Sequence, residues 1–325
     1  MHSYLDLHLH LDGALTPAMA KELAALQNIT LPVSNDESLK KLLTVSPDCE
    51  SLNSFLECFA LPLLLMQTPA GLRETVRLVG DHLLSQGLIY AEIRFAPQLH
   101  TALDMTQEDA VKAALKGLEE TALKANLILC CMRGQGNEKA NEETLELTRR
   151  YLVPDGGVVA MDLAGAEGLF PTSRYGNLFE KARAYGIPYT IHAGEADGAQ
   201  SVRAAVEYGA ARIGHGVRSR EDPEVMEMLK EKGITLELCP TSNRMTHAVE
   251  DMTDYPLLRY MDEGIPVTVN TDDPGIEDTT IEKEFHYMRE LLGLTPEQER
   301  QLLLNAVDAA FTTDEVKDSL RRQLS

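Results

Sequence analysis

Eight short runs of apolar and β-branched residues alternate along the chain with longer amphipathic segments, and no other feature constrains the fold as strongly. The runs are residues 5–10, 88–95, 127–132, 158–164, 188–193, 212–216, 234–239 and 266–271. The segments between them carry apolar residues at three- and four-residue spacing, which is typical of amphipathic helices; they are residues 69–86, 106–125, 138–152, 172–185, 198–209, 221–232 and 253–263. This alternation predicts an α/β protein, a single (β/α)8 TIM barrel.

Two parts of the chain exceed what a minimal barrel needs. Residues 14–87 follow a mostly helical pattern and are longer than one crossover requires, so we expect extra helices that cap the barrel mouth. Residues 294–311 include a Thr-Pro helix start followed by acidic residues, and we expect two or three closing helices there. The sequence has no internal repeat or Gly/Ser-rich linker, so residues 1–325 are expected to form one domain, a metal-dependent barrel of the hydrolase type.

The composition disfavours several classes of function. With 30 basic and 51 acidic residues, the formal charge is −21, which argues against binding nucleic acid or an anionic membrane. No apolar run reaches the length of a membrane span. Five cysteines without a CxxC pair favour neither a disulfide framework nor a thiolate zinc site. Together with an N-terminus that lacks the pattern of a secretory signal, these features predict a cytoplasmic protein.

Polar residues stand at the carboxyl ends of four predicted strands. They are His8 and His10 in the first run, His192 in the fifth, His215 in the sixth, and Asp272 with Asp273 after the eighth. Residues two apart in a strand share a face, so His8 and His10 are expected to face the barrel interior together. Because TIM-barrel enzymes build their active sites at the carboxyl ends of the strands, this clustering predicts a site there.

Imidazoles that face a barrel interior need partners for their ring nitrogens. The pair His8 and His10 fits either a metal site or a structural pair bonded to carbonyls and carboxylates, and His192 favours the metal. Histidine nitrogens and the oxygen of Asp272 suit one catalytic zinc with a position left for water, whose pKa zinc lowers to about 7. Glu195 is then the natural general acid and base. An Asp-Asp-Pro sequence by itself is also common in plain turns.

Seven motifs span nearly the whole chain, in the order DLHLHLDGAL, YAEIRFAP, AMDLAGAE, IHAGE, RIGHG, CPTSN and NTDDPG. Together they resemble the adenosine deaminase family of the amidohydrolase superfamily. The resemblance implies a purine nucleoside as substrate and one Zn²⁺ per chain. It implies the zinc-dependent hydrolytic deamination of adenosine and 2'-deoxyadenosine, in which zinc hydroxide attacks purine C6 to give the 6-oxo purine, inosine from adenosine, and ammonia.

The resemblance also implies roles for the matching residues. The metal ligands are expected to be His8, His10, His192 and Asp272. Glu195 is expected to donate a proton to purine N1, and its need for that proton predicts a pKa raised by burial and neighbouring carboxylates. His215 is expected to orient and support the hydroxide without binding the metal. Asp273 matches the group that holds N7, and Gly165 matches the glycine whose N–H meets N3.

Asp12 matches the residue that binds the ribose hydroxyl, with help from His10. Relatives that act on free adenine tend to carry HIEG where this chain has HLDG, so Asp12 favours a nucleoside. Adenine, or an N6-substituted or otherwise modified aminopurine, is the alternative substrate. A binding protein without catalysis is disfavoured, because every ligand and acid position carries a competent residue.

Two other zinc hydrolase designs do not match. The deaminases that hold zinc with HxE and PCxxC are excluded because the chain has no PCxxC, and the run 158–164 offers no lysine to bridge two metals. Asp162 is expected to support a loop rather than to react, and Glu167 is expected to be structural or to lie behind the reacting residues. The chain departs from the family in residues 133–143 and at Tyr255, which stands in place of a usual histidine and is expected to lie away from the reacting centre.

Overall fold

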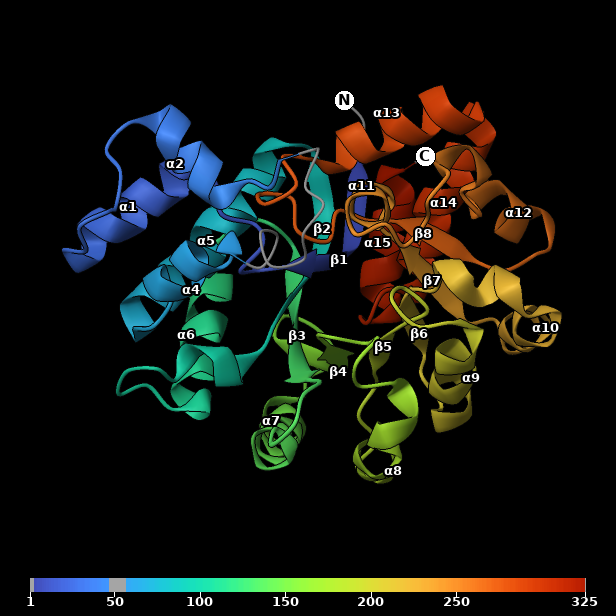
Figure 1. The fold of residues 1–325 in the computed structure, drawn as a ribbon, viewed down its shortest axis with the longest axis horizontal. Helices are drawn as coiled ribbons and strands as arrows, with labels where there is room; N and C mark the ends of the chain where they lie inside the picture. The colour runs from blue at the N-terminus through green and yellow to red at the C-terminus, as the bar shows by residue number, and fades with distance from the viewer. Residues whose placement is uncertain (1–2, 47–56, 325) are drawn as a thin grey trace.

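The computed structural model describes residues 3–46 and 57–324, and eight parallel strands form its centre (Figure 1). The strands are β1 (Tyr4–His10), β2 (Leu88–Phe95), β3 (Ala125–Met132), β4 (Val158–Ala164), β5 (Thr190–Ala193), β6 (Arg212–His215), β7 (Thr235–Leu238) and β8 (Val267–Val269). All eight predicted strands are confirmed, and β2 and β4 have the predicted bounds. The carboxyl-terminal four strands are shorter than predicted.

The strands run round in a ring. Ladders join β1 to β4 and β5 to β8 in sequence order. At the two seams, Met161 of β4 pairs with Tyr189 and Leu9 of β1 pairs with Asp272, both in parallel. Asp272 N–H donates to the carbonyl of His8, and His10 N–H donates to the carbonyl of Asp272, both at 2.8 Å. The predicted TIM-barrel architecture is therefore confirmed, and the second seam lies among the predicted site residues.

Helices cover the outside of the ring. Following the strands are α5 (Pro69–Ser85), α6 (Gln107–Glu120), α7 (Glu138–Tyr151), α8 (Gly176–Ala184), α9 (Ala199–Tyr208), α10 (Pro223–Lys232), α11 (Pro240–Met245) and α12 (Leu257–Asp262). Short 3-10 helices lie between these elements. They are η1 (Pro97–His100) after β2, η2 (Thr172–Tyr175) before α8, η3 (Val217–Glu221) before α10 and η4 (Met252–Asp254) before α12. Threonines begin two of these α-helices: the side chains of Thr68 and Thr106 each accept a hydrogen bond from a backbone N–H of the first turn, as a good N-cap does.

Two predicted helices have the wrong bounds. The prediction for residues 106–125 is too long at its end, because the backbone is extended at Thr121 and strand β3 already begins at Ala125. The prediction for residues 253–263 begins too early: Tyr255 is extended, as the residue before a proline prefers, so α12 starts only at Leu257 after Pro256.

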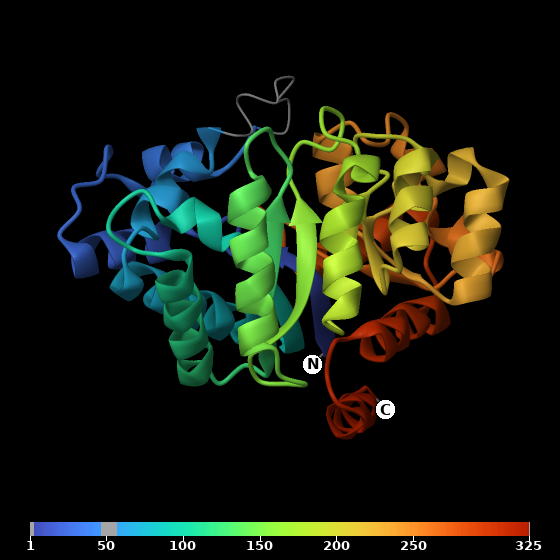
Figure 2. The same ribbon diagram turned by 90° about the horizontal axis from the view of Figure 1, so that it is seen from below.

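The C-terminal helices follow β8, and the last two of them close the amino end of the barrel. They are α13 (Ile281–Leu292), α14 (Pro296–Ala309) and α15 (Asp314–Gln323), which confirms the expectation of two or three closing helices. Thr295 and Gln298 form a capping box at the start of α14. Buried side chains of α14 and α15 pack against the first halves of β1 and β2. In Figure 2 the green arrowheads of β3 and β4 point toward the top of the view, whereas the last helix lies at the bottom beside the label C.

Between β1 and β2 the chain adds the extra helices that the sequence predicts, α1 (Pro17–Gln27), α2 (Asp36–Leu43) and α4 (Ala60–Leu65). Val45 N–H donates to the carbonyl of Ile276 at 2.8 Å, which brings this segment to the carboxyl end of β8. Residues 47–56 of the predicted mouth cap lie outside the described residues, so the cap stays a prediction.

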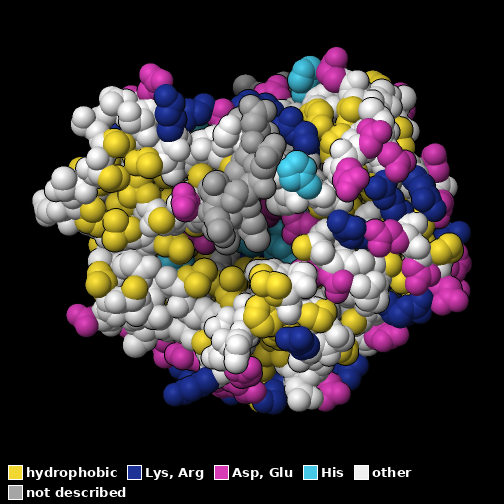
Figure 3. Space-filling model, viewed as in Figure 1, with side chains coloured by type: hydrophobic (Ala, Val, Ile, Leu, Met, Phe, Trp, Pro, Cys, Tyr) yellow, Lys and Arg dark blue, Asp and Glu magenta, His cyan; other side chains and the backbone are white. Residues whose placement is uncertain are grey.

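Hydrophobic side chains gather over the part of the surface where Figure 1 places α1, α2 and α4 (Figure 3). Leu26, Leu42 and Leu64 are among the exposed large apolar side chains.

Among the helices of the described residues, none combines the length and the apolar character that a membrane span requires.

Candidate metal centre and active site

Three imidazoles and one carboxylate converge at the carboxyl end of the barrel. His8 and His10 come from β1 and His192 comes from β5. The Nε2 atom of His192 lies 3.1 Å from the Nε2 atoms of both His8 and His10. The Oδ1 atom of Asp272 lies 3.2 Å from Nε2 of His8 and 3.3 Å from Nε2 of His10. The structure thus brings together the four residues that the sequence predicts as metal ligands.

The other nitrogen of two of these rings is held by a buried carboxylate. His8 Nδ1 lies 2.7 Å from Oε2 of Glu237, and His192 Nδ1 lies 2.9 Å from Oδ2 of Asp162. An ionised carboxylate can only accept, so each neutral ring keeps its proton on Nδ1 and directs the Nε2 lone pair inward. Two lone pairs 3.1 Å apart repel each other unless they share a cation or a proton. This donor set therefore fits a metal ion.

Protonation of the rings is compatible with metal binding. Burial lowers the pKa of His192 to about 4 and lowers the pKa of His10 well below its usual value. Burial and Arg94 act to lower the pKa of His8, but Asp272 and Glu237 outweigh them and raise it to about 8. A metal ion that binds at neutral pH therefore meets two neutral rings and displaces a proton from the third.

The backbone at two site residues is strained. His215 has a φ of +60° and Asp272 a φ of +62°, which is a left-handed conformation that non-glycine residues rarely adopt. Such a residue costs roughly 1–3 kcal/mol and persists where the surroundings over-determine it. At Asp272 the seam hydrogen bonds with β1 supply that constraint. These hydrogen bonds also place the Asp272 carboxylate beside His8 and His10 of β1.

His215 lies between the donor cluster and Glu195. Its Nε2 atom is 3.5 Å from Oε2 of Glu195 and 3.8 Å from Oδ2 of Asp272. A second possible donor set, with all atoms within 4.8 Å of one another, contains His215 with His8, His192 and Asp272. We favour the set with His10, because its Nε2 is within 3.3 Å of Asp272 whereas that of His215 is 3.8 Å away.

The loop that carries Glu195 is held by another buried glutamate. The carboxylate of Glu167 accepts hydrogen bonds from the backbone N–H groups of four consecutive residues, Gly194, Glu195, Ala196 and Asp197, at 2.7–3.1 Å. Gly194 makes the turn after β5 at a φ of +71°. Glu167 therefore positions the loop of Glu195, the predicted general acid, and the sequence signal for it was only that AGAE follows β4.

The surroundings of Glu195 favour the protonated form of its carboxyl group by raising its pKa. Burial raises its pKa; His215 opposes this, whereas Asp272 and Glu167 add to it. The direction agrees with the sequence prediction. Thr246 Oγ1 donates to Oε1 of Glu195 at 3.1 Å, which leaves Oε2 on the side of His215.

Besides His10, three residues are predicted to bind the purine or the ribose, and they lie at the ends of different strands. Asp12 follows β1, Gly165 follows β4 and Asp273 follows Asp272. Burial raises the pKa of Asp12 to about 6, and Asp272 adds to the effect. Burial also raises the pKa of Asp273 well above its usual value, with Asp272 and Asp12 adding to it. The Oδ1 atom of Asp273 has no hydrogen-bond partner among the described residues, so this buried polar atom is available to a ligand.

Tyr255 lies closer to the chemistry than the sequence suggested. Its hydroxyl donates to Oδ1 of Asn243 at 2.8 Å, and Nδ2 of Asn243 lies 3.1 Å from Nδ1 of His215. All three side chains are buried. The expectation that Tyr255 is remote is wrong, because Asn243 of α11, which follows β7, contacts both Tyr255 and His215 at the end of β6. Asn243 thus links Tyr255 to a candidate catalytic ring.

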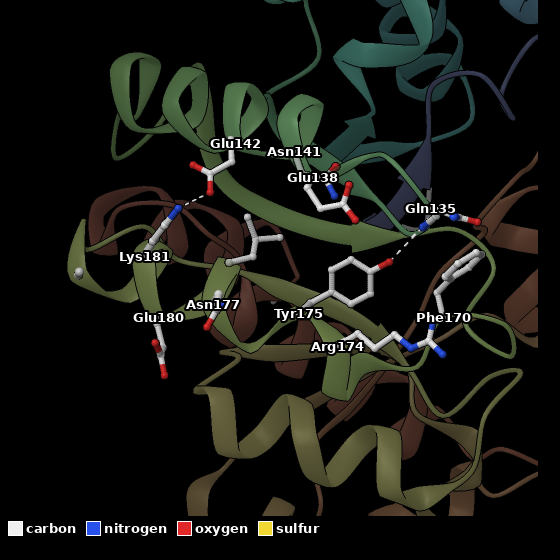
Figure 4. Close-up of a pocket in the computed structure, with 13 residues that line it drawn as sticks. Gln135, Glu138, Asn141, Glu142, Phe170, Arg174, Tyr175, Asn177, Glu180 and Lys181 are labelled. Carbon is white, nitrogen blue, oxygen red and sulfur yellow. Dashed lines mark hydrogen bonds and ion pairs between the residues drawn. The ribbon is translucent and has the colours of Figure 1, made fainter.

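A groove of about 850 Å³ lies away from this cluster, between α7 and the segment of η2 and α8 (Figure 4). Lys181 and Glu142 form an ion pair at one end, and Tyr175 Oη accepts from Gly134 N–H at 3.0 Å at the other. The unfamiliar residues 133–143 form one wall. None of the four predicted metal ligands lines this groove, so the groove is not the predicted active site.

Substitution of Gly13, which lies against Asp273, tests whether Asp273 is positioned for a ligand. A Cβ atom at Gly13 would lie 1.8 Å from Oδ1 of Asp273. We expect Gly13→Ala to displace that carboxyl group and to lower kcat/KM for adenosine, the substrate that the sequence resemblance implies, about 10- to 100-fold, the range for one lost hydrogen bond to a charged or buried group. Gly168→Ala is the control, because a Cβ there meets only ordinary contacts. An unchanged kcat/KM in steady-state assays of Gly13→Ala contradicts the role of Asp273.

Comparisons with known proteins agree with the geometry. A family model described as adenosine deaminase matches residues 4–325. An adenosine deaminase of Haemophilus ducreyi is 49% identical over 325 residues, which covers 98% of this chain and 94% of the relative. One of Enterococcus faecalis is 36% identical over 324 residues, with coverages of 98% and 95%.

Solved structures share the fold. An adenine deaminase from Arthrobacter aurescens matches with a TM-score of 0.86 and 26% identity, covering 99% of this chain and 97% of that one. The N6-methyl-AMP deaminase from Arabidopsis thaliana matches with a TM-score of 0.85 and 23% identity, covering 99% and 96%. The second similarity concerns the fold alone.

Proposed function

The chain belongs to the adenosine deaminase family, and from this premise we propose that it hydrolyses adenosine and 2'-deoxyadenosine at purine C6 with one zinc ion. Water and the nucleoside give the 6-oxo nucleoside and ammonia. The observation that carries the proposal is the convergence of three imidazole Nε2 atoms and the Asp272 carboxylate within 3.1–3.3 Å.

We assign the metal to His8, His10, His192 and Asp272. Three nitrogen donors and one oxygen donor suit zinc, and the imidazole–carboxylate pairs around the site are typical of zinc centres. When bound, the ion lowers the pKa of a water molecule and so supplies a hydroxide nucleophile near neutral pH.

The remaining steps use side chains of this chain. Glu195 holds a proton and donates it to N1 of the purine, which makes C6 more electrophilic. His215 lies 3.5 Å from Glu195 and 3.8 Å from Asp272, where it can donate to the oxygen that attacks C6. Asp272 can accept the proton that this oxygen gives up. Transfer of this proton from Asp272 to the amino group then allows the C6–N bond to break and ammonia to leave.

The substrate is held from three strand ends. Asp273 is assigned to purine N7 and the backbone N–H of Gly165 to N3. The raised pKa of Asp273 favours a protonated carboxyl that donates to N7, which has a lone pair. Asp12 and His10 are assigned to the ribose hydroxyl.

The choice between a nucleoside and a free base depends on Asp12. The fold by itself does not decide it, because an adenine deaminase shares it. We expect Asp12→Ala to raise the KM for adenosine about 10- to 100-fold through a lost hydrogen bond to a charged group, with kcat less affected. Asp12→Asn, which keeps the size and one acceptor, should lose less. Steady-state kinetics on adenosine and adenine measure both effects, and equal KM values in all three proteins contradict the assignment.

The reaction itself is tested by ultraviolet absorbance with adenosine, 2'-deoxyadenosine and adenine in separate assays. We expect both nucleosides to be deaminated, activity to be lost after chelation, and activity to return with added zinc. If adenine alone reacts, the nucleoside assignment fails. If none of the three reacts although one equivalent of zinc is bound, the proposed adenosine reaction fails, and modified aminopurines are the substrates to test next.

A further inference from the structure

One arginine touches both carboxylates that support the metal-donor imidazoles. Arg94 lies on β2, and its side chain is completely buried. Its Nη1 donates to Oδ2 of Asp162 at 2.8 Å, and its Nη2 donates to Oε2 of Glu237 at 2.9 Å. Asp162 bonds to His192, and Glu237 bonds to His8. A single planar guanidinium therefore bridges the supports of two proposed ligands that come from different strands.

Arg94 also contacts the backbone of the strand that carries the HxH pair. Its Nη2 donates to the carbonyl of Leu7 at 2.6 Å. The backbone of Arg94 lies opposite His10 in the β1–β2 ladder, and Leu11 N–H donates to its carbonyl at 2.9 Å. The side chain thus fixes the carboxylate behind His8 and the peptide that precedes His8 at once.

The geometry needs an arginine and not merely a positive charge. Guanidinium presents several N–H donors in a rigid plane, whereas lysine presents one ammonium on a flexible stem. Among the described side chains, Arg94 is the one that hydrogen-bonds to both Asp162 and Glu237. Arg212 is equally buried, but it donates to Glu237 at 2.6 Å and to Glu92 at 2.5 Å and makes no such bond to Asp162.

We propose that Arg94 is a positioning residue that sets the affinity and geometry of the metal centre. It acts by holding Asp162 and Glu237, so that the imidazole bonded to each directs its Nε2 lone pair at the shared position. The inference rests on the metal site proposed above, and it adds a group that touches neither metal nor substrate.

Metal affinity tests the role without substrate. Wild type, Arg94→Gln and Arg94→Lys are stripped of metal, and the Kd for Zn²⁺ is measured by competition with a chromophoric chelator. We expect Arg94→Gln to bind Zn²⁺ about 10- to 100-fold more weakly, the usual effect of losing an outer partner of a metal ligand. Arg94→Lys should restore part of the affinity. The absorption bands of bound Co²⁺ should shift in both variants, and kcat for adenosine should fall more than KM changes.

Arg212→Lys is the matched control, because Arg212 is an equally buried guanidinium that contacts Glu237 but, within the described part of the chain, makes no hydrogen bond to Asp162. It should weaken Zn²⁺ binding less than Arg94→Lys. Wild-type Zn²⁺ affinity and an unshifted Co²⁺ spectrum in Arg94→Gln overturn the proposal. If Arg94→Gln does not fold, the same two readings on Arg94→Lys decide by the same criterion. If wild type itself binds no Zn²⁺, both this inference and the proposed metal site fail. If wild type binds Zn²⁺ and the variants bind it equally tightly, only the role of Arg94 fails and the proposed function stands.

Discussion

Replacing His192 with alanine is expected to lower kcat/KM for adenosine by about 10,000-fold or more, because a water molecule without the metal has a pKa of about 15.7 and not about 7. His192 Nε2 lies 3.1 Å from Nε2 of His8 and of His10, so the substitution removes one of the four proposed metal ligands. It also leaves the buried carboxylate of Asp162 without its imidazole partner. The variant should therefore lose both bound metal and activity.

The measurement combines metal analysis with steady-state kinetics on the same preparation. His286→Ala on α13 is the control, since His286 is exposed and lies outside the donor cluster. A His192→Ala protein that retains one metal per chain and activity within 10-fold of wild type contradicts the ligand assignment.

Replacing Glu195 with glutamine is expected to lower kcat about 100- to 10,000-fold, the range for loss of a general acid, while bound metal stays at the wild-type level. The amide keeps the shape of the side chain and can still accept from Thr246 Oγ1. It has no acidic proton to give to purine N1. The loss should therefore fall on kcat far more than on metal content.

The pH dependence gives this prediction a sign. Glu195 must be protonated to act, and burial raises its pKa above the usual value of a glutamate. Activity of the wild type should fall as the pH rises through this raised pKa, and Glu195→Gln should lack that alkaline limb. Glu227→Gln, at an exposed position of α10, is the control. A Glu195→Gln protein with near-normal kcat and the wild-type pH profile would show that another group is the acid.

The barrel could be predicted from the sequence because each strand is short and buried. The run at 88–95 is bounded by a glycine before it and a proline after it, and its predicted bounds agree with β2. Helix ends were harder to predict. The pattern of α6 continues into Thr121, where the extended backbone ends the helix, and the apolar periodicity does not reveal that change.

The donor residues could be predicted because histidines at strand ends are unusual, and β1 alone carries two of them. Among the residues behind them, Asp162 was expected to have a supporting role, but two others were not predicted. Arg94 and Glu237 sit in runs that otherwise read as buried strands, and the only signal was a charge within an apolar segment. Which imidazole each carboxylate supports depends on the order of strands round the ring, which one sequence does not contain. The link from Tyr255 to His215 was missed for the same reason.

The most direct test of the proposed centre is a titration of metal-free protein with Zn²⁺, followed by the rate at which adenosine is converted to inosine. The four converging donors predict that activity rises in proportion to added zinc and levels off at one equivalent per chain. A break at two equivalents, or a chain that binds one equivalent and leaves adenosine unchanged, would contradict a single-zinc adenosine deaminase centre.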